Sequence, residues 1–430
     1  MRILILASNY PHAGHSFSGI FNERCAAALR EICEKVEVIV PRPYVPSILA
    51  SFVSRWQVYA QIPPYEVRNG IPVNRPAYLQ IPWLGKVLSF DRSAYLFSRH
   101  AAMEMHRRIQ FDAILSFGLE AGGLAWRLGK VLNIPACGWA TGGDVRVPAA
   151  SSSGRIVINT LKHLDLIFYQ SSELLEKAAE LLGTSPDRMP YGRHTVLPRG
   201  IPIPPVLQSK QIRNRVRSAL GIPDAHTLVL SVGRICREKG VYELLQAVAL
   251  AVRQNPQITC LLVGAMPALD ETPMVQKAVN QVAELRNRVR ILPACDPERI
   301  WEYLHAADIF AFTSHREGMP NSLLEAMAAG VPSVAFSIPA VLELEAQTGA
   351  LLLVPPFDVA SFADAILRLA ASPEERLHLA ARGKTRVADG FVVEKNMTKA
   401  VQLIAQVVQR KKESLFMEKS INGCSQREEY

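Results

Sequence analysis

One stretch decides the fold of the second half of the chain, and it reads Thr313-Ser-His-Arg-Glu-Gly-Met-Pro-Asn-Ser-Leu-Leu-Glu-Ala-Met-Ala-Ala-Gly-Val-Pro-Ser-Val-Ala-Phe336. It begins where the short apolar run Ile309 to Phe312 ends, continues through a loop, and enters a helical pattern from Ser322 to Ala329. Another apolar run, Ser333 to Ala335, follows. We interpret the stretch as a loop, a helix and a strand that continue from a preceding strand, which is the repeating unit of a helix-covered parallel sheet.

The same alternation extends over both halves of the chain. In the second half we expect strands at Leu228–Val232, Thr259–Val263 and Val289–Leu292, and helices at Val241–Arg253 and Val275–Leu285. In the first half we expect strands at Ile3–Ala7, Val36–Val40, Ala113–Ser116, Ile134–Cys137 and Leu166–Tyr169, and a helix at Phe21–Ile32. The sequence therefore predicts an α/β protein with two doubly wound, Rossmann-like domains that face a central cleft.

A proline-rich segment, Pro198 to Gln211, is the expected linker between the domains. We accordingly predict an N-terminal, acceptor-binding domain over 1–200 and a C-terminal, donor-binding domain over 201–395. Residues 396–410 are expected to form a helix that packs back on the first domain. The polar tail 411–430 lacks apolar periodicity, so we expect it to be poorly ordered.

Composition narrows the class of protein. The 430 residues are 49% hydrophobic and 20% charged, as in ordinary globular proteins, and carry a net charge of +9 that favours anionic partners. Basic runs are short, so nucleic acid is not expected as a partner. The seven cysteines include no C-x-x-C spacing, which argues against a disulfide framework and a zinc site. Because no apolar run approaches the ~18 to 20 residues of a spanning helix, we expect a cytoplasmic protein.

Two carboxylates mark a candidate ligand site in the quoted stretch. Glu317 falls in the loop after a strand, where open α/β sheets bind ligands, and Glu325 lies one turn into the following helix. Carboxylates accept hydrogen bonds from vicinal hydroxyls, and the free N–H groups of a first helical turn bind phosphate. The pair therefore suits a sugar nucleotide. The alternative is a solvated helix carboxylate beside a loop charge.

Two cations mark a second candidate element, Ser231-Val-Gly-Arg-Ile-Cys-Arg-Glu-Lys-Gly240. Gly233 and Arg234 follow a strand, and Lys239 precedes a helix, so the two cations can clamp a pyrophosphate and offset charge on a leaving diphosphate. The alternative is a pair of surface charges beside a turn.

The two elements together resemble the GT-B glycosyltransferases grouped as family 4, with their E-x7-E signature, and Gly349 to Pro356 with the helix Ser361 to Leu369 resembles the family's closing section. The resemblance implies that Glu325 binds ribose, that Glu317 binds the transferred sugar, and that Arg234 and Lys239 bind the diphosphate. It makes Arg234, Lys239 and Glu317 the catalytic candidates. The remaining donor-binding candidates are Gly233, Gly318, Met319, Pro320, Asn321 and Ser322. No D-x-D pair is present, so no metal or other cofactor is expected.

Weaker candidates lie in the first half. The family resemblance carries Gly19 over as the glycine of a ligand-binding loop, with Ser18 in place of a second glycine; His12 and His15 in this loop are expected to be solvated or packed. Thr141 stands where many relatives have histidine, and Asp144 is a candidate acceptor of hydrogen bonds from sugar or acceptor hydroxyls. The alternative for Asp144 is a structural loop carboxylate.

Aromatic and basic residues are scattered over Val45 to Ser98 and allow a peripheral contact with an anionic membrane. The alternative is a helical subdomain with a half-buried face. These residues are Phe52, Arg55, Trp56, Tyr59, Tyr65, Arg68, Arg75, Tyr78, Trp83, Lys86, Phe90, Arg92, Tyr95 and Phe97.

The leading hypothesis is a retaining hexosyltransferase that moves a sugar from a UDP- or GDP-sugar to a saccharide or lipid-linked acceptor in cell-surface polysaccharide synthesis, at the inner face of the membrane. A nucleotide-binding dehydrogenase is excluded because no G-x-G-x-x-G follows a strand. A non-catalytic scaffold or donor-sensing subunit of a polysaccharide assembly complex and a sugar-nucleotide epimerase remain as alternatives.

Overall fold

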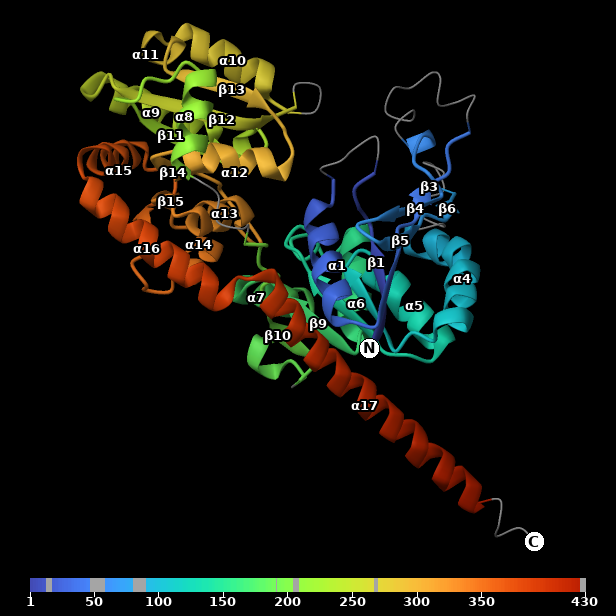
Figure 1. Cartoon of the computed structure of the whole chain (residues 1–430). Coiled ribbons are helices and arrows are strands. Elements are labelled where there is room, and N and C mark those ends of the chain that lie inside the picture. Colours follow the sequence, from blue (N-terminus) through green and yellow to red (C-terminus); the bar gives the residue numbers. More distant parts are fainter. Residues whose placement is uncertain are drawn as a thin grey trace. The chain divides into compact units, whose positions relative to one another are not determined.

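The computed structural model describes residues 1–12, 18–46, 59–79, 90–190, 192–203, 209–266 and 270–425, and the chain divides into two compact units (Figure 1). Unit 1 comprises Met1–Arg199 and Val393–Tyr430, and unit 2 comprises Gly200–Val392. The division at Arg199 falls within the segment that we expected to be a linker. The predictions for His15, Phe52, Arg55, Trp56, Trp83 and Lys86, and for the linker residues Pro204 and Pro205, lie outside the described residues.

Unit 1 is built on an eight-stranded sheet with the strand order β10-β9-β8-β7-β1-β2-β5-β4. Within this sheet only β4 runs antiparallel to its neighbour. The strands are β1 (Arg2–Ala7), β2 (Lys35–Ile39), β4 (Tyr65–Arg68), β5 (Ile71–Asn74), β7 (Ala113–Phe117), β8 (Ala136–Ala140), β9 (Leu166–Tyr169) and β10 (His194–Val196). β3 (Arg42–Pro43) and β6 (Ala77–Tyr78) form a separate short parallel pair.

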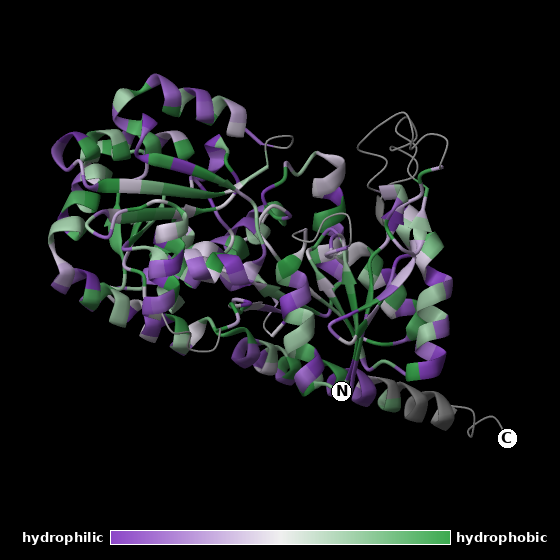
Figure 2. Ribbon diagram, turned by 45° about the horizontal axis from the view of Figure 1, so that its top comes forward, coloured by the Kyte–Doolittle hydropathy of each residue, from purple (hydrophilic) through white to green (hydrophobic). Residues whose placement is uncertain are grey.

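Helices cover both faces of this sheet. Along β1, Ile3 and Ile5 share one core with α1 and α17, whereas Leu4 and Leu6 share the other with α4 to α7, as the period of two in a strand requires. Figure 2 shows the central strands in green, while purple residues gather on the helices. The described helices are α1 (Ile20–Ile32), α4 (Phe90–Ile109), α5 (Gly122–Leu132), α6 (Ser152–His163), α7 (Ser172–Leu181) and α17 (Val393–Ser425), and Pro186–Arg188 form the 3-10 helix η2.

The C-terminal helix α17 packs beside α1 through the buried Met397, Ala400 and Ile404. We expected residues 411–430 to be poorly ordered, whereas in the structure α17 continues as a helix to Ser425. Lysine, glutamate, leucine and methionine favour helix, and extending a helix that is already packed requires no new nucleation.

Three further details differ from the predicted elements. β8 begins at Ala136 rather than Ile134, because Pro135 has no N–H to donate to a ladder. The predicted helix Val275–Leu285 is two helices, α10 (Thr272–Gln281) and α11 (Ala283–Arg286). β4 and β5 form a hairpin across Asn69 and Gly70, both with positive φ (48° and 73°), which the sequence analysis did not predict.

Unit 2 contains a six-stranded, fully parallel sheet with the order β13-β12-β11-β14-β15-β16. Numbered along unit 2, this order is 3-2-1-4-5-6, the Rossmann arrangement. The α/β class and the two Rossmann-like units are therefore confirmed. The strands are β11 (Thr227–Val232), β12 (Ile258–Ala265), β13 (Val289–Pro293), β14 (Ile309–Phe312), β15 (Ser333–Phe336) and β16 (Leu352–Val354).

The helices of unit 2 enclose one large hydrophobic core. α9 packs beside α15, whereas α8 packs beside α12 and α13 beside α16 (Figure 1). Their bounds are α8 (Ser209–Ala219), α9 (Val241–Gln254), α12 (Pro297–Ala306), α13 (Asn321–Ala329), α14 (Pro339–Glu345), α15 (Val359–Ala371) and α16 (Pro373–Gly390).

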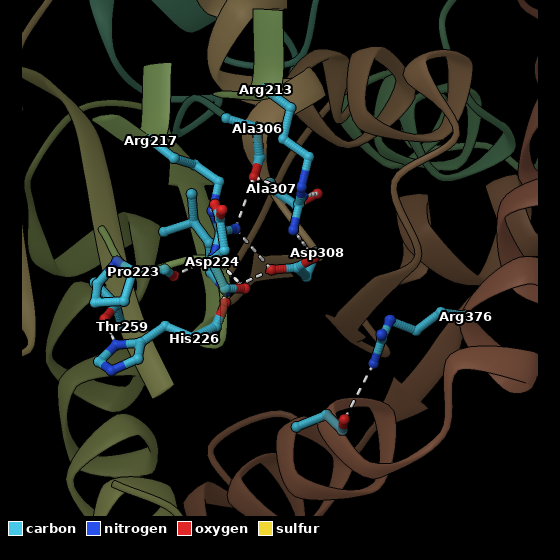
Figure 3. Close-up of polar contacts among 12 residues, drawn as sticks. Arg213, Arg217, Pro223, Asp224, His226, Thr259, Ala306, Ala307, Asp308 and Arg376 are labelled. Carbon is cyan, nitrogen blue, oxygen red and sulfur yellow. Dashed lines mark hydrogen bonds and ion pairs between the residues drawn. The ribbon is translucent and has the colours of Figure 1, made fainter. Parts of the chain in front are cut away.

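A buried ion pair fastens α8 to the amino end of the sheet (Figure 3). Arg217, whose side chain is only 1% exposed, donates from Nη1 to Asp308 Oδ2 at 3.1 Å, and Arg213 donates to Asp308 Oδ1 at 2.8 Å. Asp308 Oδ2 also accepts the Leu228 N–H at the start of β11, at 2.7 Å. Arg217 donates further to the carbonyls of Ala306, Pro223 and His226, so this cluster ties α8 to the start of β11 and β14.

Among the helices of the described residues, none combines the length and the apolar composition that crossing a membrane would require.

Candidate active site

The candidate site lies at the carboxyl ends of β11 and β14, where the strand order of unit 2 reverses. These two strands are neighbours, with Val229 opposite Ile309 and Leu230 opposite Phe310. The chain passes from β11 to β12 on one side and from β14 to β15 on the other. Loops that leave neighbouring strands in opposite directions form a crevice for ligands in open α/β sheets. The two sequence elements with the candidate residues are these two loops.

Glycines shape the loop after β11. Gly233 has a φ of 156°, and, its chain neighbours aside, no atom of the described residues lies within 4 Å of the position that a Cβ would take, so this side of the backbone has room for a ligand. A Cβ on Gly264, at the end of β12, would lie 2.3 Å from the Gly233 carbonyl oxygen. Gly264 is thus required for the close approach of the two strand ends, although no sequence motif marks it.

The loop then forms one 3-10 turn, η3 (Arg237–Lys239), which docks on the loop after β14. A Cβ on Gly240 would lie 1.9 Å from the Thr313 carbonyl oxygen, so only glycine permits this contact. Thr313 Oγ1 donates to the Lys239 carbonyl at 3.1 Å, and the His315 N–H donates to the Glu238 carbonyl at 3.0 Å. The absence of a side chain at Gly240 therefore allows the loop after β11 to pack directly against the loop after β14.

This docking brings together two of the three predicted catalytic residues. Lys239 Nζ donates to Glu317 Oε1 at 2.5 Å, although the two residues are 78 positions apart in the chain. Ser314 Oγ donates to the same oxygen at 2.8 Å. The two side chains are 29% and 15% exposed, so the pair is half-buried and remains accessible to a ligand. The arrangement orients the Glu317 carboxylate and holds a cation at the reversal of strand order.

Arg234, the third predicted catalytic residue, is not part of this pair. Its side chain is 55% exposed and reaches Glu238 at 3.6 Å, which is a weak surface contact. The guanidinium is therefore available to an anion at the end of β11.

The start of α13 provides backbone donors. Its N-cap position is Pro320, and the N–H groups of Ser322 and Leu323 have no acceptor among the described residues. Met319 and Pro320 are buried, and Met319 packs in the core, so the predicted contacts of Gly318 to Ser322 can come only from the backbone and from the half-exposed Asn321 and Ser322. Such N–H groups favour an anion.

Glu325 lies in the same helix and is only 6% exposed. We expected it to contact a ligand and not to take part in packing, but the structure places it among the buried residues of α13. A substitution at Glu325 will therefore affect the packing of the helix as well as a ligand.

Two carboxylates that the sequence analysis did not identify hold the β11 loop from its other side. Glu271 Oε1 accepts the Arg237 N–H at 3.0 Å, and Asp270 Oδ2 accepts the N–H of Met266 at 2.8 Å and of Ile235 at 3.4 Å. The Arg237 N–H and the Tyr242 hydroxyl lower the pKa of Glu271. Burial raises the pKa of Asp270, but hydrogen bonds from Thr272, Met266 and Ile235 outweigh it and lower the net value. No motif marks these residues, because their role depends on contacts between loops.

In unit 1, Gly19 precedes α1 with a φ of 75°. A Cβ there would lie 2.7 Å from the Asn9 carbonyl oxygen. The glycine is thus required by the chain after β1, which also accepts a hydrogen bond from Asn22 of α1 at 2.9 Å. This packing accounts for Gly19 without a ligand.

Asp144 is buried and links two loops at the carboxyl end of the unit 1 sheet. Its carboxylate accepts the N–H groups of Leu119, Thr141, Gly142 and Val145 at 2.8 to 3.1 Å, and the Thr141 hydroxyl at 3.2 Å. Because these donors occupy both oxygens, the geometry favours the structural alternative for Asp144 over a direct contact with sugar hydroxyls.

Comparisons with known proteins agree with this architecture. Residues 212–386 match the model of the family described as glycosyl transferases group 1. Over 371 residues, the chain is 28% identical to TuaC of Bacillus subtilis, a glycosyltransferase whose name provisionally assigns it to teichuronic acid biosynthesis; the match covers 86% of this chain and 89% of TuaC. It is 31% identical over 175 residues to a D-inositol 3-phosphate glycosyltransferase of Corynebacterium urealyticum, covering 40% of this chain and 41% of that protein.

The fold has a solved counterpart in Anabaena HepE, whose crystal structure contains UDP and glucose. The two structures superpose with a TM-score of 0.71 at 19% identity, over 94% of this chain and 100% of HepE. Residues 212–386 therefore form a domain of the glycosyl transferases group 1 family, and the chain is a glycosyltransferase with the GT-B fold.

Proposed function

We propose that this glycosyltransferase takes a sugar from a UDP- or GDP-sugar and transfers it, with retention at the anomeric carbon, to a saccharide or lipid-linked acceptor. The contact between Lys239 and Glu317 at the reversal of strand order carries this proposal. It brings a cation, an oriented carboxylate and the N–H groups of α13 to one edge of the unit 2 sheet. This set matches the diphosphate and the hydroxyls of a nucleotide sugar.

The proposed roles follow from the charges. Lys239, the exposed Arg234 and the α13 N–H groups stabilise the negative charge that develops on the leaving diphosphate. Glu317 already accepts hydrogen bonds from Lys239 and Ser314, which favours a role in orienting the sugar hydroxyls over that of a nucleophile. Same-face attack assisted by the donor phosphate then accounts for retention, and Glu325 is assigned to the ribose.

Our proposals for the donor nucleotide and for the biosynthetic pathway are based on similarity to known proteins. HepE was crystallised with UDP, which supports a nucleotide-sugar donor here. TuaC supports a place in cell-surface polysaccharide synthesis.

One helix of unit 1 supports a peripheral contact with an anionic membrane. On α4, Arg92, Leu96, Arg99, His100 and Arg107 are exposed and fall on one helical face, beside the exposed Phe97. Other residues of the segment that we considered for this contact have structural partners: Arg75 pairs with Glu66 at 2.5 Å, and Arg68 pairs with Glu23 at 2.7 Å. A lipid-linked acceptor would lie at such a surface. Co-sedimentation with phosphatidylglycerol vesicles, lost in Arg99→Glu and absent with phosphatidylcholine, tests this contact.

Calorimetric titration with UDP, GDP and ADP tests the donor assignment. We expect UDP or GDP to bind to the wild type and to bind far more weakly to Lys239→Ala. If no nucleotide binds, with or without anionic vesicles, the donor site is not where we place it. Release of an epimer from the donor without any acceptor would favour an epimerase.

A further inference from the structure

We infer that Glu271 is a positioning residue that holds the diphosphate-binding turn in shape. The inference rests on the proposed function, because it assigns Glu271 a role through Arg234 and Lys239 rather than through contact with the donor. Neither the family motifs nor the predicted site includes this carboxylate.

The turn that carries the cations needs support from outside. Between Arg234 and Gly240 the chain forms a single 3-10 turn, closed by hydrogen bonds from the Lys239 N–H to the Cys236 carbonyl and from the Gly240 N–H to the Arg237 carbonyl. Short 3-10 turns have poor hydrogen-bond geometry and are weakly stable alone. Ile235 is buried in the core just before the turn, but Arg237 and Glu238 of the turn itself are exposed, so burial contributes little to holding the turn beyond Ile235. Arg234 and Lys239 will therefore keep fixed positions only if neighbouring loops hold the turn in place.

Glu271 fastens the turn at both ends. Its Oε1 accepts the Arg237 N–H at 3.0 Å, where the turn begins, and its Oε2 accepts the Tyr242 hydroxyl at 2.9 Å, in the first turn of α9. The Glu271 N–H donates to the Ile235 carbonyl at 2.9 Å. The Arg237 guanidinium lies over the Tyr242 ring, 5.1 Å from its centroid. One carboxylate thus bridges the two segments that flank Lys239.

The opposite side of the turn is fixed by the loop after β14, through Thr313 and His315. The turn is therefore held between two loops, and Lys239 reaches Glu317 from this fixed frame. Removing one of the two supports leaves the turn attached but free to shift, which moves its cations without exposing the core.

A direct role in binding ribose is the competing explanation, because an acidic residue beyond a neighbouring strand binds ribose in dinucleotide folds. Both Glu271 oxygens already accept hydrogen bonds from the protein. The contacts favour the positioning role.

Calorimetry with the nucleotide that binds the wild type, together with amide hydrogen exchange of unliganded protein, tests the inference. We expect Glu271→Ala to weaken nucleotide binding about tenfold through the lost hydrogen bonds, with only a small decrease in the midpoint of thermal unfolding. Exchange should rise in the peptide that spans Ile235 to Gly240. Glu271→Gln retains an acceptor for the Arg237 N–H and a group that can pair with the Tyr242 hydroxyl, so it should restore both properties.

Glu284→Ala is the matched control. Glu284 also lies beside α9, with Arg253 at 2.7 Å, and its pKa is also lowered by that contact, but it touches no part of the turn. Wild-type affinity and wild-type exchange in Glu271→Ala would overturn the inference, as would an equal effect in Glu284→Ala. The exchange measurement needs no nucleotide, so it decides the positioning role even if the donor assignment fails.

Discussion

Unit 2 has two ion-paired clusters, one at each end of the same two strands, and they differ in how far their polar groups are satisfied. At the amino ends of β11 and β14, the Arg217 side chain is 1% exposed and donates to Asp308 and to four backbone carbonyls. At the carboxyl ends, Lys239 is 29% exposed and pairs with one carboxylate. Arg234 and the first N–H groups of α13 lie at that same edge.

The difference in exposure and hydrogen bonding between Arg217 and Lys239 distinguishes a cation that stabilises the fold from one that can bind a ligand. A buried cation whose two terminal nitrogens both donate to the protein is closed to a ligand, and its removal leaves a carboxylate without compensation. A half-exposed cation that, among the described residues, pairs with one carboxylate can exchange that partner for a substrate. Burial and hydrogen-bond satisfaction, rather than the presence of an ion pair, are the grounds on which we propose the carboxyl edge of the sheet as the donor site.

The largest effect on stability is expected at the amino edge. Asp308→Ala removes the near carboxylate of the buried Arg217, leaving only the exposed Asp224 at 3.9 Å, and removes the acceptor of the Leu228 N–H, so we expect a loss of about 3 to 5 kcal/mol in the free energy of unfolding. Urea denaturation measures it. Arg215→Ala is the control on the same helix, because Arg215 is 62% exposed and its pair with Glu302 should contribute less than about 1 kcal/mol. Equal losses in the two variants would remove the distinction between the clusters.

At the carboxyl edge, Lys239→Ala should reduce activity strongly and stability only slightly, the reverse of the effect expected for Asp308→Ala. We expect donor turnover to fall about 10²- to 10³-fold, because the cation that stabilises the leaving diphosphate is lost. The free energy of unfolding should change by less than about 1 kcal/mol. Release of nucleotide diphosphate from the donor measures turnover. Arg316→Ala, which breaks an exposed pair with Glu238 in the same loops, should keep wild-type turnover; a loss there as large as in Lys239→Ala would mean that any charge in these loops suffices.

Glu325→Gln should show a smaller, mixed effect. The glutamine keeps the volume of a side chain that is 6% exposed, so the helix should remain packed, whereas the loss of charge-assisted hydrogen bonds to ribose should weaken nucleotide binding about tenfold. Calorimetry and urea denaturation of the same variant separate the two contributions. Wild-type affinity would remove Glu325 from the site.

The smallest effect concerns pH. The Arg237 N–H and the Tyr242 hydroxyl lower the pKa of Glu271, the Arg237 charge adds to this, and Asp270 opposes it. A carboxylate with a lowered folded-state pKa contributes stability above its ordinary pKa, here 4.5, and this contribution is lost as pH falls through the folded value. The small advantage in thermal midpoint of wild type over Glu271→Gln should therefore be present at pH 7 and be lost as the pH falls below 4.5 and through the lowered pKa of Glu271. An advantage that grows on acidification would contradict this sign.

Candidate site residues could be selected from the sequence where they belong to a local sequence motif. Glu317, Glu325, Arg234 and Lys239 stand in motifs, and alternating apolar runs located most strands. The contact between Lys239 and Glu317 joins residues 78 positions apart, so it required the fold. Asp144 and Glu325 show the limit of such reasoning, because the donors around one and the burial of the other arise from tertiary packing. The β4–β5 hairpin was predictable, since Asn69-Gly70 is a strong turn signal.

Amide hydrogen exchange of unit 2 with and without saturating nucleotide tests the central claim most directly. If the carboxyl ends of β11 and β14 bind the donor, UDP or GDP will protect the peptides that contain Gly233 to Gly240 and Ser314 to Glu325, and will leave those around Arg217 and Asp308 unchanged. Protection at the amino ends, or at neither edge while nucleotide binds, would contradict the account.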